Sequence, residues 1–153
     1  ALYVDLINRI IDGRPDDMTV AVHFCRGNSM GRWVAEGGYD AIAEIVFGGL
    51  KADALFMEYD TPRAGDFAPL RYVTDDKIVV LGLISTKTGS LEEKDDLKRR
   101  IDEAAKLVPL ERLCLSPQCG FASTEEGNVL ETDQQWDKLA MIVDLATEVW
   151  GEV

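Results

Sequence analysis

Short apolar runs alternate with longer amphipathic segments along the 153-residue chain. Four runs rich in β-branched and other apolar residues predict strands at Met18 to Cys25, Ala52 to Glu58, Ile78 to Ser85 and Arg112 to Ser116. Each run is largely continuous in apolar character rather than alternating, which is typical of parallel strands buried on both faces. The pattern therefore predicts a parallel sheet.

Segments with apolar residues at helical spacing lie between these predicted strands. Ser90 and Glu93 stand three residues apart, as in a capping box that opens a helix. Helices are predicted over residues 2–12, 39–47 and 91–107 and from a cap at Thr132 or Asp133 to about Trp150, with a helical turn over residues 66–73. Repeated strand–loop–helix units favour a doubly wound sheet or a (βα)8 barrel, of which four units fill half. We expect residues 1–153 to form one such segment without a linker.

Charge and cysteine content narrow the classes of partner and compartment. The net charge of −12 argues against nucleic acid and against an anionic membrane surface. No apolar stretch approaches the roughly 18 residues of a membrane-spanning helix, and no signal peptide is visible. Three cysteines without a secretory signal are better interpreted as thiols than as a disulfide framework, which fits a cytoplasmic location.

At or just after the ends of three predicted strands lie residues of the types that bind metals. His23 and Cys25 stand two residues apart, so both point to one face of their strand. Glu58 closes the next strand and Cys119 follows the last. The carboxyl ends of parallel strands meet at one edge, and one imidazole, two thiols and a carboxylate suit tetrahedral zinc. The alternative is that Glu58 pairs with Arg63 and that Cys119 is an inert loop thiol.

Three segments carry a family resemblance: 23–28 (HFCRGN), 57–59 (MEY) and 116–120 (SPQCG). Together and in this order they resemble the zinc-site segments of cobalamin-independent methionine synthases, and the similarity extends over nearly the whole chain. The resemblance implies the C-terminal half of a (βα)8 (TIM) barrel with strands five to eight. It also implies zinc as the cofactor, held by His23, Cys25, Glu58 and Cys119.

The implied chemistry is alkyl transfer to a thiol. Zinc removes the proton from a coordinated thiol and so produces a nucleophile near neutral pH. The resemblance suggests homocysteine as the thiol substrate and methyl-folate as the donor. However, the segment 83–88, where those enzymes place a histidine acid, offers only Ser85 or a neighbour. A methyl-corrinoid or an epoxide as donor, and coenzyme M as acceptor, therefore stay open.

The remaining expectations concern single residues. Arg26 and Asn28 follow the metal pair and are candidates for binding an anionic group of the thiol substrate, such as a carboxylate or sulfonate. The alternative is that Arg26 only balances nearby acids such as Glu58 or Asp60. We interpret Cys114 as a core residue and Lys87 as an exposed loop lysine, with binding of an anionic tail as the alternative role of Lys87.

Three functions stay open: a methionine synthase-like enzyme, a thiol transferase with another acceptor, and an inactive fragment with a structural zinc. Half a barrel exposes strand edges, so we expect a homo-oligomer or a longer polypeptide, and no activity from this chain alone.

Overall fold

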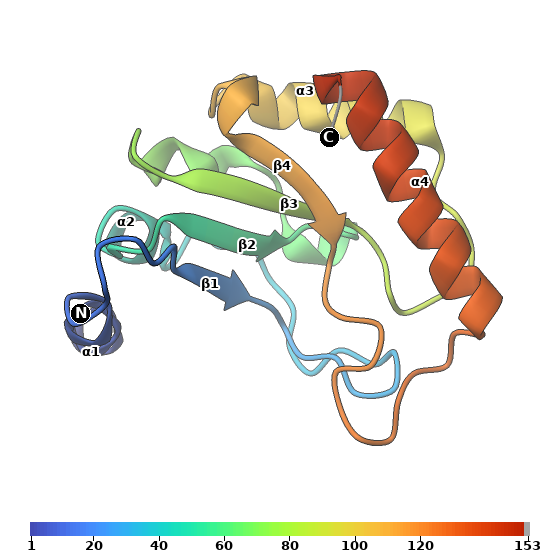
Figure 1. Cartoon of the computed structure of the whole chain (residues 1–153), viewed down its shortest axis with the longest axis horizontal. Coiled ribbons are helices and arrows are strands. Elements are labelled where there is room, and N and C mark those ends of the chain that lie inside the picture. Colours follow the sequence, from blue (N-terminus) through green and yellow to red (C-terminus); the bar gives the residue numbers. More distant parts are fainter. Residues whose placement is uncertain (152–153) are drawn as a thin grey trace.

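The computed structural model describes residues 1–151 of the chain. Its centre is a four-stranded parallel sheet in the order β1-β2-β3-β4. The strands are β1 (Ala21–Phe24), β2 (Ala54–Glu58), β3 (Ile78–Ile84) and β4 (Leu113–Pro117). All four predicted strands are confirmed, and their arrows point the same way in Figure 1.

Helices connect the strands and flank the sheet, with α1 beyond β1 and α4 beside β4 (Figure 1). They are α1 (Leu2–Ile11), α2 (Ala43–Phe47), α3 (Lys94–Ala105) and α4 (Thr132–Trp150). Short 3-10 helices η1 (Pro62–Ala64), η2 (Ala68–Tyr72) and η3 (Leu110–Arg112) complete the connections. No helix among the described residues is long and apolar enough to cross a membrane.

Three helix starts differ from the prediction. The capping box at Ser90 and Glu93 is wrong, because Glu92 accepts hydrogen bonds from the Ser85 backbone N–H (2.8 Å) and from the buried Lys138 Nζ (3.1 Å). Lys138 Nζ also donates to the Ser90 carbonyl at 2.6 Å. Residues 90–92 are thereby held outside the helix.

The cap of the last helix lies one residue before the earlier of its two predicted positions, and the helix itself begins at Thr132. Glu131 is the N-cap of α4 and forms a capping box with Gln134. The predicted helix 39–47 is also shorter, since its regular part begins only at Ala43.

The two faces of the sheet have different surroundings. Leu55, Leu81 and Leu113 are fully or almost fully buried in the core that the helices cover. On the other face, register aligns His23, Phe56, Val80 and Cys114 in one row across the strands.

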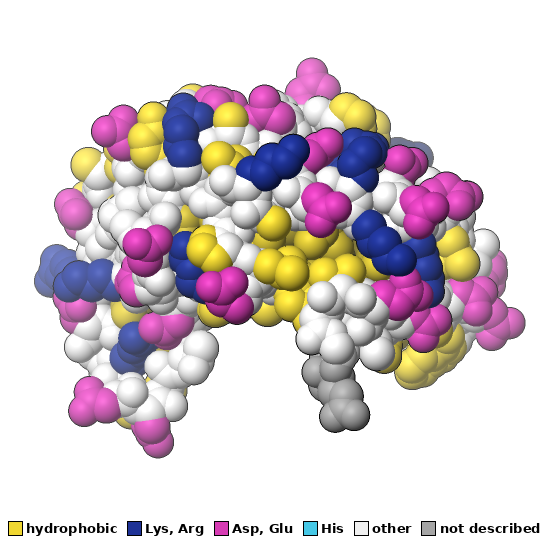
Figure 2. Space-filling view, turned by 90° about the horizontal axis from the view of Figure 1, so that it is seen from above, with side chains coloured by type: hydrophobic (Ala, Val, Ile, Leu, Met, Phe, Trp, Pro, Cys, Tyr) yellow, Lys and Arg dark blue, Asp and Glu magenta, His cyan; other side chains and the backbone are white. Residues whose placement is uncertain are grey.

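The second face is partly open to solvent. Phe56 is 37% exposed and Cys114 is exposed, so the prediction that Cys114 is a core residue is wrong for this chain. Figure 2 shows hydrophobic side chains gathered in a hollow on one side of the molecule. Apolar surface of this kind commonly contacts further polypeptide.

Candidate metal centre

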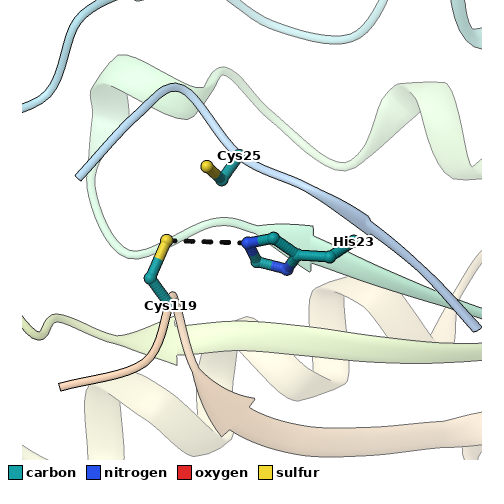
Figure 3. Close-up of side chains that lie close together, drawn as sticks. All are labelled: His23, Cys25 and Cys119. Carbon is teal, nitrogen blue, oxygen red and sulfur yellow. Dashed lines mark hydrogen bonds between the residues drawn. The ribbon is translucent and has the colours of Figure 1, made fainter. Parts of the chain in front are cut away.

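Three of the four predicted ligands converge at the carboxyl ends of the strands. His23 lies in β1, Cys25 directly after it and Cys119 after β4. Their ligand atoms all lie within 4.8 Å of one another, and Cys119 Sγ is 3.6 Å from His23 Nε2 (Figure 3). Side chains 96 positions apart in the chain therefore face one common space.

Glu58 ends β2 at the same rim but is not a member of that close group. Its Oε2 accepts a hydrogen bond from the Arg26 backbone N–H at 2.6 Å. Its Oε1 is paired with Arg63 and lies 3.4 Å from Lys87 Nζ. The alternative pairing of Glu58 with Arg63 is thus present in the structure.

The charge state of Glu58 follows from these contacts. Burial raises the pKa of the carboxyl, but hydrogen bonds from Arg63 and the Arg26 N–H and the charge of Lys87 outweigh it. The net result is a pKa below the usual value, so Glu58 is ionised at neutral pH.

The pKa of the Cys119 thiol is shifted in the opposite direction. Burial, followed by the neighbouring Cys25, raises the pKa of Cys119 to about 12. Without a cation the thiol stays protonated, and a bound metal would have to displace that proton.

A pocket of about 350 Å³ opens beside the imidazole and the Cys119 thiol. Its volume lies in the range of small-molecule sites. The pocket is lined by His23, Phe56, Ser116, Pro117, Cys119 and Gly120. A small thiol placed there would lie next to two of the three converging side chains.

The two predicted substrate contacts are both buried beside this centre. Arg26 is 8% and Asn28 9% exposed. Asn28 Nδ2 donates to Thr86 Oγ1 and to Ser123 Oγ, both at 3.2 Å, while its Oδ1 has no hydrogen-bond partner among the described residues. The Arg26 guanidinium donates to the Tyr39 hydroxyl and to three backbone carbonyls, and its Nη1 lies 3.6 Å from Glu58 Oε2.

At this rim the prediction that Lys87 is an exposed loop lysine is wrong, and Tyr39 was missed from the sequence. Lys87 is buried rather than exposed, and its Nζ pairs with Asp60 at 3.1 Å as well as with Glu58. Its position just after β3 is a signal that could have identified it. The hydroxyl of Tyr39 accepts a hydrogen bond from the Glu58 backbone N–H at 2.9 Å, and no sequence motif marks it.

Comparison with known proteins decides the family. Residues 9–148 match the family model described as "Cobalamin-independent synthase, Catalytic domain". The chain belongs to this family. The resemblance noted in the sequence is therefore confirmed.

Individual relatives agree with that assignment. Two uncharacterized proteins of Bacillus subtilis (strain 168), YxjG and YxjH, are 58% identical over 150 residues and 55% identical over 151. The matches cover 97% and 98% of this chain but 40% of each relative. This chain thus spans about two fifths of their length.

Solved structures agree as well. A Listeria monocytogenes protein provisionally described as a vitamin-B12-independent methionine synthase is 46% identical, with a TM-score of 0.77 over 98% of this chain and 41% of its own. A B12-independent methionine synthase from Shewanella sp. W3-18-1, in complex with selenomethionine, is 18% identical, with a TM-score of 0.73 over 95% of this chain and 42% of its own. The prediction of half a TIM barrel is confirmed by this likeness.

Proposed function

We propose that this chain is the zinc-binding half of a catalytic barrel that activates a thiol, with homocysteine as the candidate, for alkyl transfer. His23, Cys25 and Cys119 would hold the metal, with Glu58 as fourth ligand. The observation that carries the proposal is the convergence of two thiols and one imidazole at the carboxyl rim of a member of this family.

The converging donors fit zinc in kind and spacing. Thiolate and imidazole are ligands that zinc prefers. Bonds of about 2.3 Å to sulfur and 2.05 Å to nitrogen at tetrahedral angles place the two ligand atoms about 3.6 Å apart. The Cys119 Sγ to His23 Nε2 distance is 3.6 Å. This pair therefore supports a zinc site without rearrangement.

Zinc bound here would keep a coordinated substrate thiol deprotonated near neutral pH. The chain contributes the pocket beside His23 and Cys119, where Phe56 provides an apolar wall for the body of the substrate. If a substrate displaced Glu58 from the metal, its ion pairs with Arg63 and Lys87 would still stabilise the negative charge of its carboxylate. A position that can open in this way favours a catalytic over a closed structural site.

Asn28 and Arg26 are the proposed contacts to the polar end of the substrate. Asn28 Oδ1 is buried and accepts no hydrogen bond within residues 1–151, so a substrate N–H could donate to it. Arg26 would first have to release one of its protein acceptors.

The other half of the barrel would come from a longer polypeptide or from a second copy. This proposal rests on the four-stranded sheet and on the length of the relatives. We propose methyl-folate and methyl-corrinoid as the first donors to test. The cytoplasmic location stays a prediction.

Metal analysis combined with zinc-edge X-ray absorption, with and without homocysteine, tests this function. We expect about one zinc per chain with sulfur, nitrogen and oxygen neighbours, and an additional sulfur neighbour when homocysteine is added. An unchanged set of neighbours would identify a structural metal and overturn thiol activation. Absence of bound zinc would overturn the whole proposal.

A further inference from the structure

Cys25 lies one residue beyond β1 and is not held by the sheet. Pairing of β1 with β2 runs from Ala21, opposite Ala54, to Phe24, opposite Met57. His23 is inside this ladder, so the sheet fixes its position. Metal sites need their ligands held within about 0.5 Å of the productive geometry. Another contact must therefore fix the backbone that carries the Cys25 thiol.

The main chain of Arg26, the next residue, is held from two sides. Its N–H donates to Glu58 Oε2 at 2.6 Å. Its carbonyl oxygen accepts hydrogen bonds from the N–H groups of Val34 and Ala35, both at 2.9 Å. The chain directly after Cys25 is thus fixed to the end of β2 and to its own following loop.

The side chain of Arg26 adds four hydrogen bonds at the same rim. Nε donates to the Gly37 carbonyl at 2.7 Å, and Nη2 to the Ala64 carbonyl at 3.2 Å. Nη1 donates to the Tyr39 hydroxyl at 3.1 Å and to the Glu58 carbonyl at 3.2 Å. The guanidinium also lies 4.2 Å from the centre of the Tyr39 ring, a cation–π contact. A planar group with this fan of donors cannot be replaced by the single ammonium of lysine.

Tyr39 completes the connection between the two strand ends. Its hydroxyl accepts the Glu58 N–H at 2.9 Å and lies 3.3 Å from the Phe24 carbonyl oxygen. The same atom therefore contacts the last residue of β1 and the last residue of β2. Arg26 and Tyr39 together join the strand that carries His23 to the strand that carries Glu58.

We propose that Arg26, supported by Tyr39, is a positioning residue that holds Cys25 within bonding reach of the metal shared with His23 and Cys119. This inference rests on the proposed zinc site, and it gives Arg26 a role in metal binding before any substrate is bound. Contacts around metal ligands typically change metal affinity by 10–100-fold when they are removed. Arg26 donates hydrogen bonds to one proposed metal ligand, Glu58, and directly follows another, Cys25, in the sequence.

The test measures metal binding by the 153-residue chain without substrate. Co²⁺, a spectroscopic substitute for zinc, is titrated into wild type and Arg26→Lys, followed by competition with zinc and a chelator. Arg112→Lys is the matched control. Arg112 donates to the carbonyls of Thr74 (3.0 Å) and Lys77 (3.3 Å), at the opposite end of the sheet.

We expect Arg26→Lys to bind zinc about 10–100-fold more weakly than wild type, and Arg112→Lys to match wild type. The Co²⁺ thiolate charge-transfer band should also weaken in Arg26→Lys, because Cys25 leaves the metal. A residue important only for general stability would not change the number of coordinated thiolates. Tyr39→Phe, which removes one hydroxyl, should give a smaller loss of affinity and provides the result if Arg26→Lys fails to fold.

The outcomes separate the two proposals. If wild type binds neither Co²⁺ nor zinc, the proposed function fails and this inference fails with it. If wild type binds and both Arg26→Lys and Tyr39→Phe retain its affinity and its charge-transfer band, the positioning role is refuted while the zinc site stands. If Arg26→Lys then weakens only homocysteine binding, Arg26 is a substrate contact instead.

Discussion

The two ends of the sheet use the same ionic side chains in different ways. At the amino end, each cation pairs with one acid that is at least 38% exposed. These pairs are Arg14–Asp53, Lys77–Asp76 and Arg112–Asp75. At the carboxyl end, Arg63 and Lys87 each contact both Glu58 and Asp60, and the two carboxylates are completely buried.

Unpartnered polar atoms follow the same division. Buried side-chain atoms without a hydrogen-bond partner occur, within residues 1–151, only in segments that follow β1, β2 and β4. They belong to Asn28, Tyr59, Asp60, Thr61, Arg63 and Gln118. Buried charges and unsatisfied groups lower stability, so their collection at one rim indicates a functional site there. Loss of one charge should therefore cost more at the carboxyl end, where the carboxylates are buried, than at the amino end, where the acids are partly or fully exposed.

The largest expected effect is loss of metal from the carboxyl rim. Cys119→Ser removes a converging thiol, and we expect zinc affinity to fall by about 100-fold or more, beyond the range for residues that only support ligands. The measurement is zinc content after dialysis against a chelator.

Cys114→Ser is the matched control for Cys119→Ser. Cys114 lies on the same face of the sheet but outside the converging group. Equal zinc retention by both variants would remove Cys119 from the site.

The second largest effect is on the free energy of unfolding without metal, when one acidic charge is removed at either end of the sheet. Glu58→Gln leaves Arg63 and Lys87 with a weaker buried partner, and we expect it to lower the free energy of unfolding by about 3 kcal/mol. Asp53→Asn weakens a partly exposed pair and should cost about 1 kcal/mol or less. Urea unfolding at pH 7 measures both values, and a larger loss for Asp53→Asn would reverse the proposed division.

The difference between Glu58→Gln and wild type should depend on pH. The contacts that lower the Glu58 pKa stabilise the fold fully above the unfolded pKa of about 4.3, and this contribution is lost as pH falls through the lower folded value. Protonated glutamate resembles glutamine, so the two unfolding free energies should converge as the pH falls from about 5 through the lowered pKa of folded Glu58. Urea unfolding over this range provides the test, and a difference that stays constant would show that Glu58 is not stabilised as a carboxylate.

The sequence predicted the strands because continuous apolar runs leave few alternatives. The three converging ligands could be predicted from the sequence for a related reason: residues at the carboxyl ends of parallel strands meet at one edge of the sheet. Helix starts were less predictable, since Glu92 is held by Lys138, a contact 46 positions away that no local motif reveals.

Other features depend on tertiary contacts that the sequence does not reveal. Burial of Lys87 follows from its pairing with Glu58 and Asp60 across the rim. Cys114 lies in an apolar run typical of a core strand, yet it is exposed because the described residues 1–151 leave that face of the sheet partly uncovered. A local pattern shows what a side chain is suited to, and its partners decide whether it becomes buried.

The smallest expected effect concerns the outer edge of the carboxyl rim. Trp33 is 53% exposed, but its ring lies 4.9 Å from the guanidinium of Arg63, which also donates to the Ala35 carbonyl at 2.9 Å. Trp33→Ala should lower the free energy of unfolding by about 0.5–1 kcal/mol, the usual strength of an exposed cation–π contact.

Trp136→Ala in α4 is the control, because Trp136 is 63% exposed and no guanidinium or ammonium of the part that the structure describes lies over its ring. It should change stability by less than about 0.5 kcal/mol. Urea unfolding followed by circular dichroism measures both variants without depending on tryptophan fluorescence. An equal effect for the two would mean that the buried ion pairs at the carboxyl rim hold Arg63 without help from the loop above it.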